Sequence, residues 1–303
     1  MTITQITFLM VICAIVPLLL SLRSIKMICS YEDQKQHGWK QLYYVIFIFA
    51  CSYLIFGSYT LINEITYSEL INATLFLGAS AFILIISRLS LNSIQRIDEI
   101  AKVERYRALH DSLTALPNRT LFYERINHAL ALAKREKSEI ALMIIDLNEF
   151  KEVNDTLGHH TGDVLLKQSS LRLKEILRES DTLARYGGDE FAVILPQTSQ
   201  AQAHALAERL TNAIHTPFTI DNRSLTIGMS VGISMYPHHA SDSNALIKLA
   251  DIAMYSAKRY QKGFLLFENE MHDELNLDVD LKLISSASAH KQQATANKNR
   301  VLN

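Results

Sequence analysis

The sequence has few glycine and proline residues, ten and five in 303. This scarcity excludes both a collagen-like chain and a broadly disordered one. The net charge is close to zero, with 30 Lys and Arg residues against 31 Asp and Glu residues. No nucleic-acid partner bound through bulk positive charge is therefore expected. The three cysteines, Cys13, Cys29 and Cys51, have spacings that fit neither a metal site nor a disulfide framework.

Charged residues are scarce in one part of the chain, because residues 1–88 hold nine of the 61 charged side chains. Stretches 1–22, 41–63 and 70–87 have none. A bilayer core needs about 20 apolar helical residues. We expect residues 1–88 to form a membrane domain with three transmembrane helices, at about 3–22, 42–62 and 70–89. Buried core helices are the alternative. Residues 1–5 lack Lys and Arg, so the first helix is expected to be retained and not cleaved as a signal peptide.

The loops between these stretches differ in charge. Loop 23–40 has four Lys and Arg residues, whereas loop 63–69 has two glutamates and no base. Five basic residues follow within residues 88–107. The positive-inside rule then places the N-terminus outside and everything after residue 88 in the cytoplasm.

Residues 89–110 contain no Pro or Gly and are expected to form a helical connector that continues the third span. Ile94, Ile97, Ala101 and Ala108 have the spacing of a two-helix seam. Two heptads also fit an amphipathic connector that lies on its own domain. A coiled stalk would make the protein a homodimer.

Helix and strand patterns alternate from residue 111, which predicts an α/β sandwich of mixed strands. The glycine pair 187–188 permits positive φ and predicts a β-hairpin. Helices are expected at 118–134, 162–177, 199–215 and 242–258, and strands at 140–145, 182–186, 191–195 and 264–267. Residues 218–235 are expected to form a strand pair that turns at 221–222.

Two acidic residues occupy special places in this pattern. Asp146 ends the buried strand 140–145, and Asp189 lies at the tip of the expected hairpin. Carboxylates at strand ends can converge on one Mg²⁺, which takes one or two of them and leaves positions for phosphate oxygens. The alternatives are that Asp146 caps the next helix and that Asp189 is a turn residue.

Five motifs in register give the chain a family resemblance. They are DSLTALPNR (111–119), DLNEFK (146–151), NDTLGH (154–159), GD (162–163) and RYGGDEF (185–191). In this order they resemble the GGDEF domain of diguanylate cyclases, over about 110–268, and Ser230–Gly232 and Ala250–Lys258 fit as well. The resemblance implies a GGDEF catalytic domain at 111–268, with a fold like the palm of nucleotidyl cyclases and polymerases. Together with the three expected spans, it predicts a multi-pass protein of the bacterial inner (cytoplasmic) membrane.

The resemblance further implies a reaction, in which two GTP condense to cyclic di-GMP with release of two pyrophosphates. Asp146, Asp189 and the Leu147 carbonyl would hold two Mg²⁺ per active site, or Mn²⁺ in their place. Asp189 would also accept the proton of the attacking 3′-hydroxyl, with Glu190 as its partner in the hairpin. Lys151 would oppose charge that develops on phosphate.

The remaining substrate contacts also follow from the resemblance. Asn154, His159 and Asp163 would contact the nucleotide, and Lys258 the terminal phosphates. For His159 the alternative is a helix start without a ligand, and for Lys151 and Lys258 a solvated lysine. Asn148 replaces a frequent second Asp of the family. Gln261 and Lys262 stand where the family usually has Gly-Arg, so Lys262 keeps the charge without the bidentate fork.

Arg178, Asp181 and Arg209 match the family's inhibitory site for the product cyclic di-GMP, and a surface salt bridge is the alternative.

The polar tail 269–303 is expected to be disordered. It resembles the start of a linker to an EAL phosphodiesterase domain; none follows, so no cyclic di-GMP hydrolysis is expected. The competing function is a catalytically weak or inactive receptor that binds GTP or cyclic di-GMP and signals to a partner. The spans have too few polar groups for a transporter.

Overall fold

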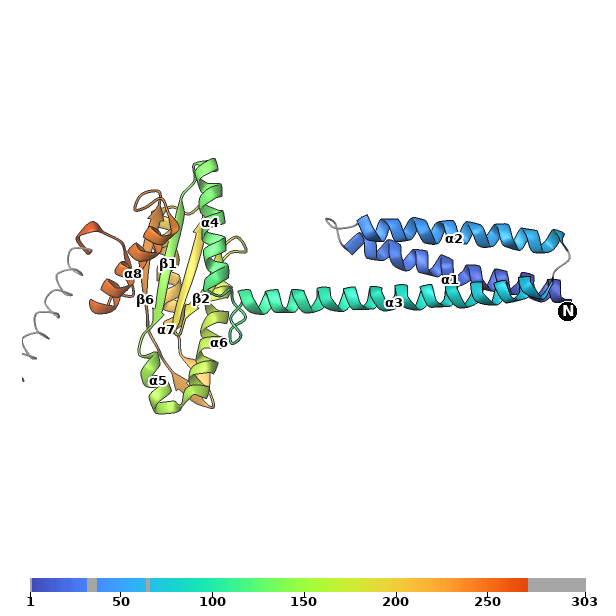
Figure 1. The fold of residues 1–303 in the computed structure, drawn as a ribbon. Helices are drawn as coiled ribbons and strands as arrows, with labels where there is room; N and C mark the ends of the chain where they lie inside the picture. Colours follow the sequence, from blue (N-terminus) through green and yellow to red (C-terminus); the bar gives the residue numbers. More distant parts are fainter. Residues whose placement is uncertain (1, 32–36, 64–65, 272–303) are drawn as a thin grey trace, which may run out of the picture. The chain divides into compact units, whose positions relative to one another are not determined.

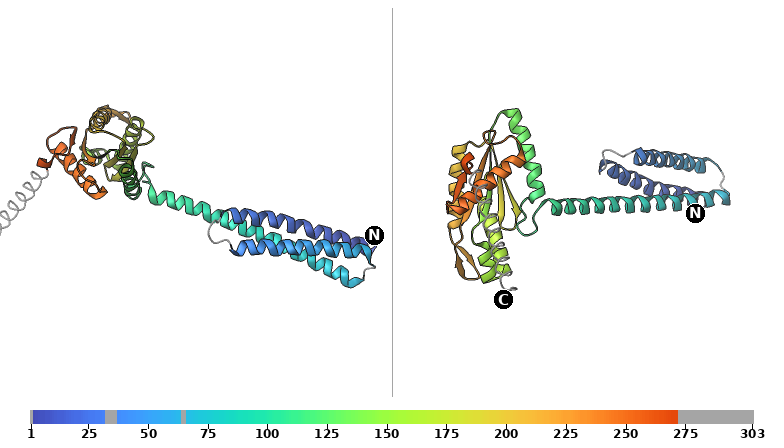
Figure 2. Two further views of the ribbon diagram at one scale, coloured as in Figure 1. Left: turned by 90° about the horizontal axis from the view of Figure 1, so that it is seen from above. Right: turned by 60° about the vertical axis from the view of Figure 1, so that its left-hand side comes forward.

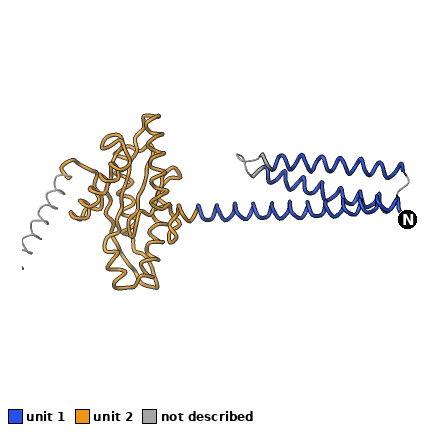
Figure 3. Tube along the Cα trace, viewed as in Figure 1, with its two compact units in different colours: residues 1–105 blue, residues 106–303 orange. Residues whose placement is uncertain are grey.

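The computed structural model describes residues 2–31, 37–63 and 66–271 of the chain. It contains two compact units, Met1–Arg105 and Tyr106–Asn303 (Figure 3). Each unit has hydrophobic clusters of its own. Most of the predicted tail 269–303, from residue 272 onward, lies outside the described residues.

The first unit is helical. It contains α1 (Ile3–Tyr31), α2 (His37–Ile62) and the greater part of α3 (Tyr67–Leu109). Leu18 and Ile25 of α1 and Ile46 of α2 belong to one buried cluster. Tyr53 joins α2 to α3, because its ring stacks on Phe76 with centroids 4.6 Å apart and its hydroxyl donates to the Phe76 carbonyl at 3.1 Å. The unit therefore has a small interior of its own.

Large apolar side chains also cover the outside of these helices. Leu19 of α1 is 56% exposed and Ile48 of α2 is 63% exposed. Exposed apolar surface on this scale is untypical of a soluble protein and fits a lipid environment. All three helices are long and apolar enough to cross a membrane, by length and composition. These helices suggest a membrane anchor.

The second unit is built on a five-stranded sheet in the order β2-β3-β1-β6-β7 (Figure 1). Its strands are β1 (Ile140–Leu147), β2 (Thr182–Gly187), β3 (Glu190–Pro196), β6 (Met229–Tyr236) and β7 (Phe264–Leu266). All neighbours are antiparallel except β6 and β7, which are parallel. The mixed sheet confirms the predicted α/β class. A separate hairpin consists of β4 (Phe218–Ile220) and β5 (Arg223–Leu225).

Helices cover both faces of this sheet (Figures 1 and 2). They are α4 (Arg119–Glu136), α5 (Phe150–Leu157), α6 (His159–Ile176), α7 (Gln200–His215) and α8 (Ser243–Arg259). The central strand β1 is buried along its whole length. Ile140, Leu142 and Ile144 belong to the core beneath α4 and α8, and the residues between them belong to the core with α6 and α7. The two-residue period of the strand places Asp146 on the α4 and α8 side.

Local signals explain where the helices begin. The Asn118 side chain accepts from the Leu121 N–H at the start of α4, and Asp242 does the same for α8. Gly232 of β6 lets α8 approach closely, since a Cβ there would overlap the Ala250 carbonyl oxygen. The close approach fixes α8 against the sheet.

Three predictions of elements need correction. Helix α5 was not expected, because an eight-residue segment with Asn, Asp and a following Gly resembles a loop. Helix α6 begins at His159 and not at residue 162, directly after Gly158 with its φ of 84°. The turn at 221–222 is confirmed, but the strand pair ends at Leu225. Residues 229–236 form β6, which pairs with β1 because both of its faces are buried in the main sheet.

Candidate active site

Four carboxylates gather where β1 ends beside the β2–β3 hairpin. Asp146 lies directly opposite Glu190 in the β1–β3 register. The Leu147 N–H donates to the Asp189 carbonyl at 3.4 Å, so the hairpin turn lies against the strand end. Asp251 of α8 is close enough to raise the pKa of Glu190. The structure thus brings together the predicted metal ligands Asp146 and Asp189 and adds Asp251, which sequence reasoning left without a role.

The carboxylates of this cluster repel one another. Burial, and then the charge of Asp146, raise the pKa of Asp189, whereas Lys258 and Arg185 lower it. Burial also raises the pKa of Glu190, followed by Asp251, Asp146 and Asp189. The pKa of Asp251 is raised by burial and by Asp146. Like charges opposite each other in a sheet are destabilising, so a positive charge near the cluster would stabilise it.

Lys258 supplies one positive charge. Its Nζ atom lies 2.5 Å from Asp146 Oδ1, and Asp146 is only 9% exposed. Lys258 reaches this position from the last turn of α8, which Gly232 holds against β6. Lys258 is therefore paired with the carboxylate cluster, although its side chain is 48% exposed.

The hairpin is held by Arg185, a residue that the motif contains but to which sequence reasoning gave no role. Its Nε and Nη2 atoms donate to the Gly188 carbonyl at 2.9 and 2.7 Å. Its Nη1 atom donates to both carboxylate oxygens of Asp111, at 3.0 and 3.1 Å. Asp111 also accepts from the Thr114 N–H and hydroxyl. Through Arg185, Asp111 of the first motif (111–119) is therefore connected to Gly188, the residue before Asp189.

The candidate nucleotide contacts lie on α5 and α6. Lys151 is on the first turn of α5, and His159 and Asp163 are on the first turns of α6; all three are exposed. Asn154 is half-buried in the second half of α5, against Gly162. Within the described part of the chain these four side chains make no hydrogen bond or ion pair, so they are available to a ligand.

The two departures from the family pattern have structural consequences. Asn148 accepts a hydrogen bond from Ser230 at 2.9 Å, which ties the end of β1 to β6. Gln261 has a φ of 54°, in the left-handed region that favours glycine. The Lys262 N–H still donates to the Ala257 carbonyl at 2.9 Å, so the backbone there stays against the end of α8.

The residues of the predicted inhibitory site do come together. Arg178, Asp181 and Arg209 line one pocket of 310 Å³. The Asp181 carboxylate accepts from the Arg178 backbone N–H at 2.9 Å. Among the described residues neither arginine side chain forms an ion pair, so the expected alternative, a surface salt bridge, is not observed.

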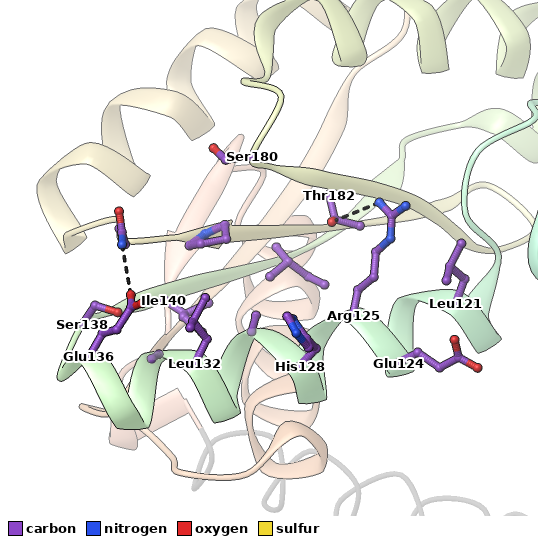
Figure 4. Close-up of a pocket in the computed structure, with 15 residues that line it drawn as sticks. Leu121, Glu124, Arg125, His128, Leu132, Glu136, Ser138, Ile140, Ser180 and Thr182 are labelled. Carbon is purple, nitrogen blue, oxygen red and sulfur yellow. Dashed lines mark hydrogen bonds between the residues drawn. The ribbon is translucent and has the colours of Figure 1, made fainter.

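A separate cavity of 460 Å³ lies between α4 and the edge strand β2 (Figure 4). It is lined by apolar side chains such as Leu132 and Ile140, and Arg125 donates to Thr182 across it at 3.3 Å. None of the predicted site residues lines this cavity.

The donor set at the end of β1 fits a hard divalent cation. Asp146 and Asp189 offer carboxylate oxygens and Leu147 a carbonyl oxygen, and Mg²⁺ is bound through one or two carboxylates with substrate phosphates completing its shell. Asp146 does not cap α5, whose N-cap is Glu149. Residues 2–31, 37–63 and 66–271 contain no group of three or more His, Cys, Asp or Glu side chains that could hold a metal ion.

Comparisons with known proteins match the second unit of the chain. Residues 108–263 match the family model described as "Diguanylate cyclase, GGDEF domain". The diguanylate cyclase TpbB of Pseudomonas aeruginosa is 43% identical over 160 residues, which cover 52% of this chain and 37% of TpbB. The cyclic di-GMP phosphodiesterase PdeR of Escherichia coli is 41% identical over 186 residues, which cover 59% of this chain and 28% of PdeR. The chain therefore matches well under half the length of either relative.

Two solved structures share the fold of the second unit. One comprises only the GGDEF domain of P. aeruginosa TpbB; it has a TM-score of 0.54 and 42% identity, and covers 55% of this chain and 99% of that one. The other is the coiled coil and GGDEF domain of DgcB from Caulobacter crescentus in complex with c-di-GMP, with a TM-score of 0.55 and 26% identity, covering 60% of this chain and 98% of that one. The family model covers more than half of the chain, and the chain belongs to the GGDEF family of diguanylate cyclases.

Proposed function

We propose that the protein is a diguanylate cyclase that condenses two GTP into cyclic di-GMP and releases two pyrophosphates. The observation that carries the proposal is the cluster of Asp146, Asp189 and Glu190 beside Lys258. Its carboxylates repel one another, and the Lys258 ammonium lies 2.5 Å from Asp146. This arrangement suits a metal-dependent reaction on phosphate and has no evident use in a purely structural domain.

We assign Asp146, Asp189 and the Leu147 carbonyl as the residues that hold two Mg²⁺ or Mn²⁺ ions. Ions bound there supply Lewis-acid activation of the α-phosphate and the 3′-hydroxyl. Asp189 accepts the proton of that hydroxyl, and burial, which raises the pKa of its carboxyl, makes the carboxylate a stronger base. Glu190, directly opposite Asp146 in the β1–β3 register, is the partner of Asp189 in the hairpin.

Three lysines serve the phosphates in this proposal. Lys258 lies at the carboxylate cluster and can turn from Asp146 toward the terminal phosphates, because its side chain is 48% exposed. Lys262 follows at the end of the same helix, and Lys151 approaches from α5. Cations placed around phosphate groups stabilise the charge that develops in the transition state.

The base is bound between α5 and α6. The Asp163 carboxylate can accept from the N1–H and 2-amino groups of guanine, and the Asn154 amide can both donate and accept. His159, on the first turn of α6, lies next to them in sequence and contacts the nucleotide. Adenine presents no donor pair of this kind to a carboxylate, so the arrangement favours GTP over ATP.

Regulation and assembly are part of the proposal. Arg178, Asp181 and Arg209 bind the product cyclic di-GMP as a feedback ligand, which the shared 310 Å³ pocket and the unpaired arginines of the described chain support. Each domain holds one GTP, so the active form is a homodimer. The 66% exposure of Ile97 on α3 supports a dimer seam there.

We also propose that the protein is a multi-pass protein of the bacterial inner membrane, with the N-terminus outside and the catalytic domain in the cytoplasm. Three helices long and apolar enough to cross a membrane support the anchor. The excess of Lys and Arg in loop 23–40 over loop 63–69 supports the orientation. A reporter enzyme fused after residue 110 should give a cytoplasmic signal, and a periplasmic signal would contradict the orientation.

The test compares the full-length protein with Asp189→Asn in detergent, with GTP and Mg²⁺ and detection of cyclic di-GMP by mass spectrometry. We expect product from the wild type and less than about one hundredth of it from the variant, a loss typical of a removed metal ligand. The second candidate is a receptor that binds GTP or cyclic di-GMP without turnover. The left-handed Gln261 and the Lys262 beside it favour this candidate. Tight nucleotide binding without product would support it.

A further inference from the structure

Asn154 and Gly162 are in close contact across the junction of α5 and α6. A Cβ added to Gly162 would overlap Asn154 Oδ1 and would lie 2.9 Å from Asn154 Cγ and 3.1 Å from Phe150 Cζ. Gly162 is buried and lies within α6, where its backbone does not require a glycine, because its φ is not positive. The space that glycine leaves is therefore used by the Asn154 side chain.

The backbone at the junction fixes the two residues relative to each other. The Gly158 N–H donates to the Asn154 carbonyl at 2.9 Å, and the Gly162 N–H donates to the Gly158 carbonyl at 3.4 Å. The Thr161 hydroxyl donates to the Leu157 carbonyl at 3.0 Å. The end of α5 is thus hydrogen-bonded to the first turn of α6, and the backbone of Gly162 is held in a fixed position against the Asn154 side chain.

The Asn154 amide has no other restraint in the described part of the chain. It is half-buried and makes no hydrogen bond with any described residue. Its orientation therefore depends on packing against Gly162. A bulkier residue at position 162 would turn the amide away, while the flexible end of the side chain would give way without unfolding the helix.

We propose that Gly162 is a positioning residue that sets the base specificity of the site by seating the Asn154 amide beside Asp163. The amide and the neighbouring carboxylate then face one purine edge together, and their donor and acceptor pattern selects guanine. The inference rests on the proposed function, in which Asn154 and Asp163 contact the base of GTP. It assigns to Gly162 a role that needs no contact of its own with the nucleotide.

The test uses the full-length protein in detergent and titrates a fluorescent GTP analogue and the matching ATP analogue, followed by steady-state kinetics with GTP. Gly162→Ala should weaken GTP binding about tenfold, the loss expected when one hydrogen-bonding group of the site is misplaced. The KM for GTP should rise while kcat changes little, the preference over ATP should fall, and the unfolding temperature should not fall. His160→Ala, at an exposed position on the same turn of α6, is the matched control and should bind GTP like the wild type.

A double-mutant cycle separates positioning from a general structural effect. Asn154→Ala should weaken GTP binding by a similar factor, and Gly162→Ala added to it should cause no further loss. Wild-type binding by Gly162→Ala, independent losses from the two substitutions, or a lower unfolding temperature in both backgrounds would overturn the inference. If Asn154→Ala binds GTP like the wild type, or the wild type itself does not bind GTP, the proposed base site fails instead, and the inference fails with it.

Discussion

Replacing Arg185 by alanine tests how the hairpin that carries Asp189 is held in place. The Arg185 guanidinium donates twice to the Gly188 carbonyl and twice to the Asp111 carboxylate, at 2.7 to 3.1 Å. Gly188 has a φ of 44° and directly precedes Asp189. Without the guanidinium, the turn loses its only side-chain tether among the described residues. The 3.4 Å backbone bond from the Leu147 N–H to the Asp189 carbonyl remains, so the Asp189 carboxylate is held less firmly beside Asp146.

The magnitude follows from burial and charge. The side chains of Arg185 and Asp111 are 16% and 21% exposed, so the pair is largely shielded from water. A hydrogen bond to a charged group contributes about 1.5–3 kcal/mol, and the loss of Arg185 also leaves Asp111 unpaired. We expect Arg185→Ala to lower the free energy of unfolding by about 3 kcal/mol. A displaced metal ligand should lower kcat by about 100-fold.

The free energy of unfolding is measured by urea titration. The initial rate of cyclic di-GMP formation is measured without urea, at a temperature at which the variant stays folded. Arg125→Ala is the matched control, because Arg125 makes a single exposed hydrogen bond to Thr182 at 3.3 Å. The control should lose less than about 1 kcal/mol and keep its activity. If Arg185→Ala keeps more than about a third of wild-type activity while folded, the tether is not what positions Asp189.

Three further predictions follow from the surroundings of the site. Burial acts to raise the pKa of Asp111, but hydrogen bonds from Thr114 and the Arg185 guanidinium hold that pKa below its ordinary value. The stability that the ionised Asp111 contributes should be complete above about pH 4 and lost as the pH falls through the lower pKa of the folded state. Below about pH 4, the free energy of unfolding in urea should therefore fall less steeply with pH for Asp111→Asn than for the wild type. Gln261→Gly should raise the free energy of unfolding by about 1 kcal/mol in urea, because it relieves a left-handed residue; an unchanged midpoint would refute that strain. Asp251→Asn should raise the thermal midpoint at pH 7.5 without metal, since burial and then Asp146 raise the pKa of Asp251, and a lower midpoint would show that its charge is compensated.

Much of the fold followed from local patterns. Helices α4 and α8 were predicted from the sequence pattern and β1 from its continuous apolar run, with ends that differ from the observed ones by at most two residues. The glycine pair predicted the β2–β3 hairpin. Caps such as Asn118 mark helix starts in the sequence itself. The separation of β6 from the β4–β5 hairpin was not predicted, because its pairing with β1 joins segments about 90 residues apart and depends on burial of both faces of the strand.

Some residues of the site could be predicted from the sequence and others could not. Asp146 and Asp189 could be proposed from their places at a strand end and a turn, and the structure puts these elements side by side. The roles of Asp111 and Arg185 could not, since a contact across 74 residues leaves no local signal. Gly162 is likewise ordinary in sequence. The need for glycine there becomes visible only in the structure, where the Asn154 side chain packs against Gly162.

The most direct test of the account is the product stoichiometry of the purified full-length protein with GTP and Mg²⁺. Cyclic di-GMP and pyrophosphate are quantified together as GTP is consumed, over a dilution series of the protein. The account predicts one cyclic di-GMP and two pyrophosphates for every two GTP consumed, with a specific activity that falls on dilution as dimers dissociate. GTP that is bound but not consumed, or a different product, would contradict it.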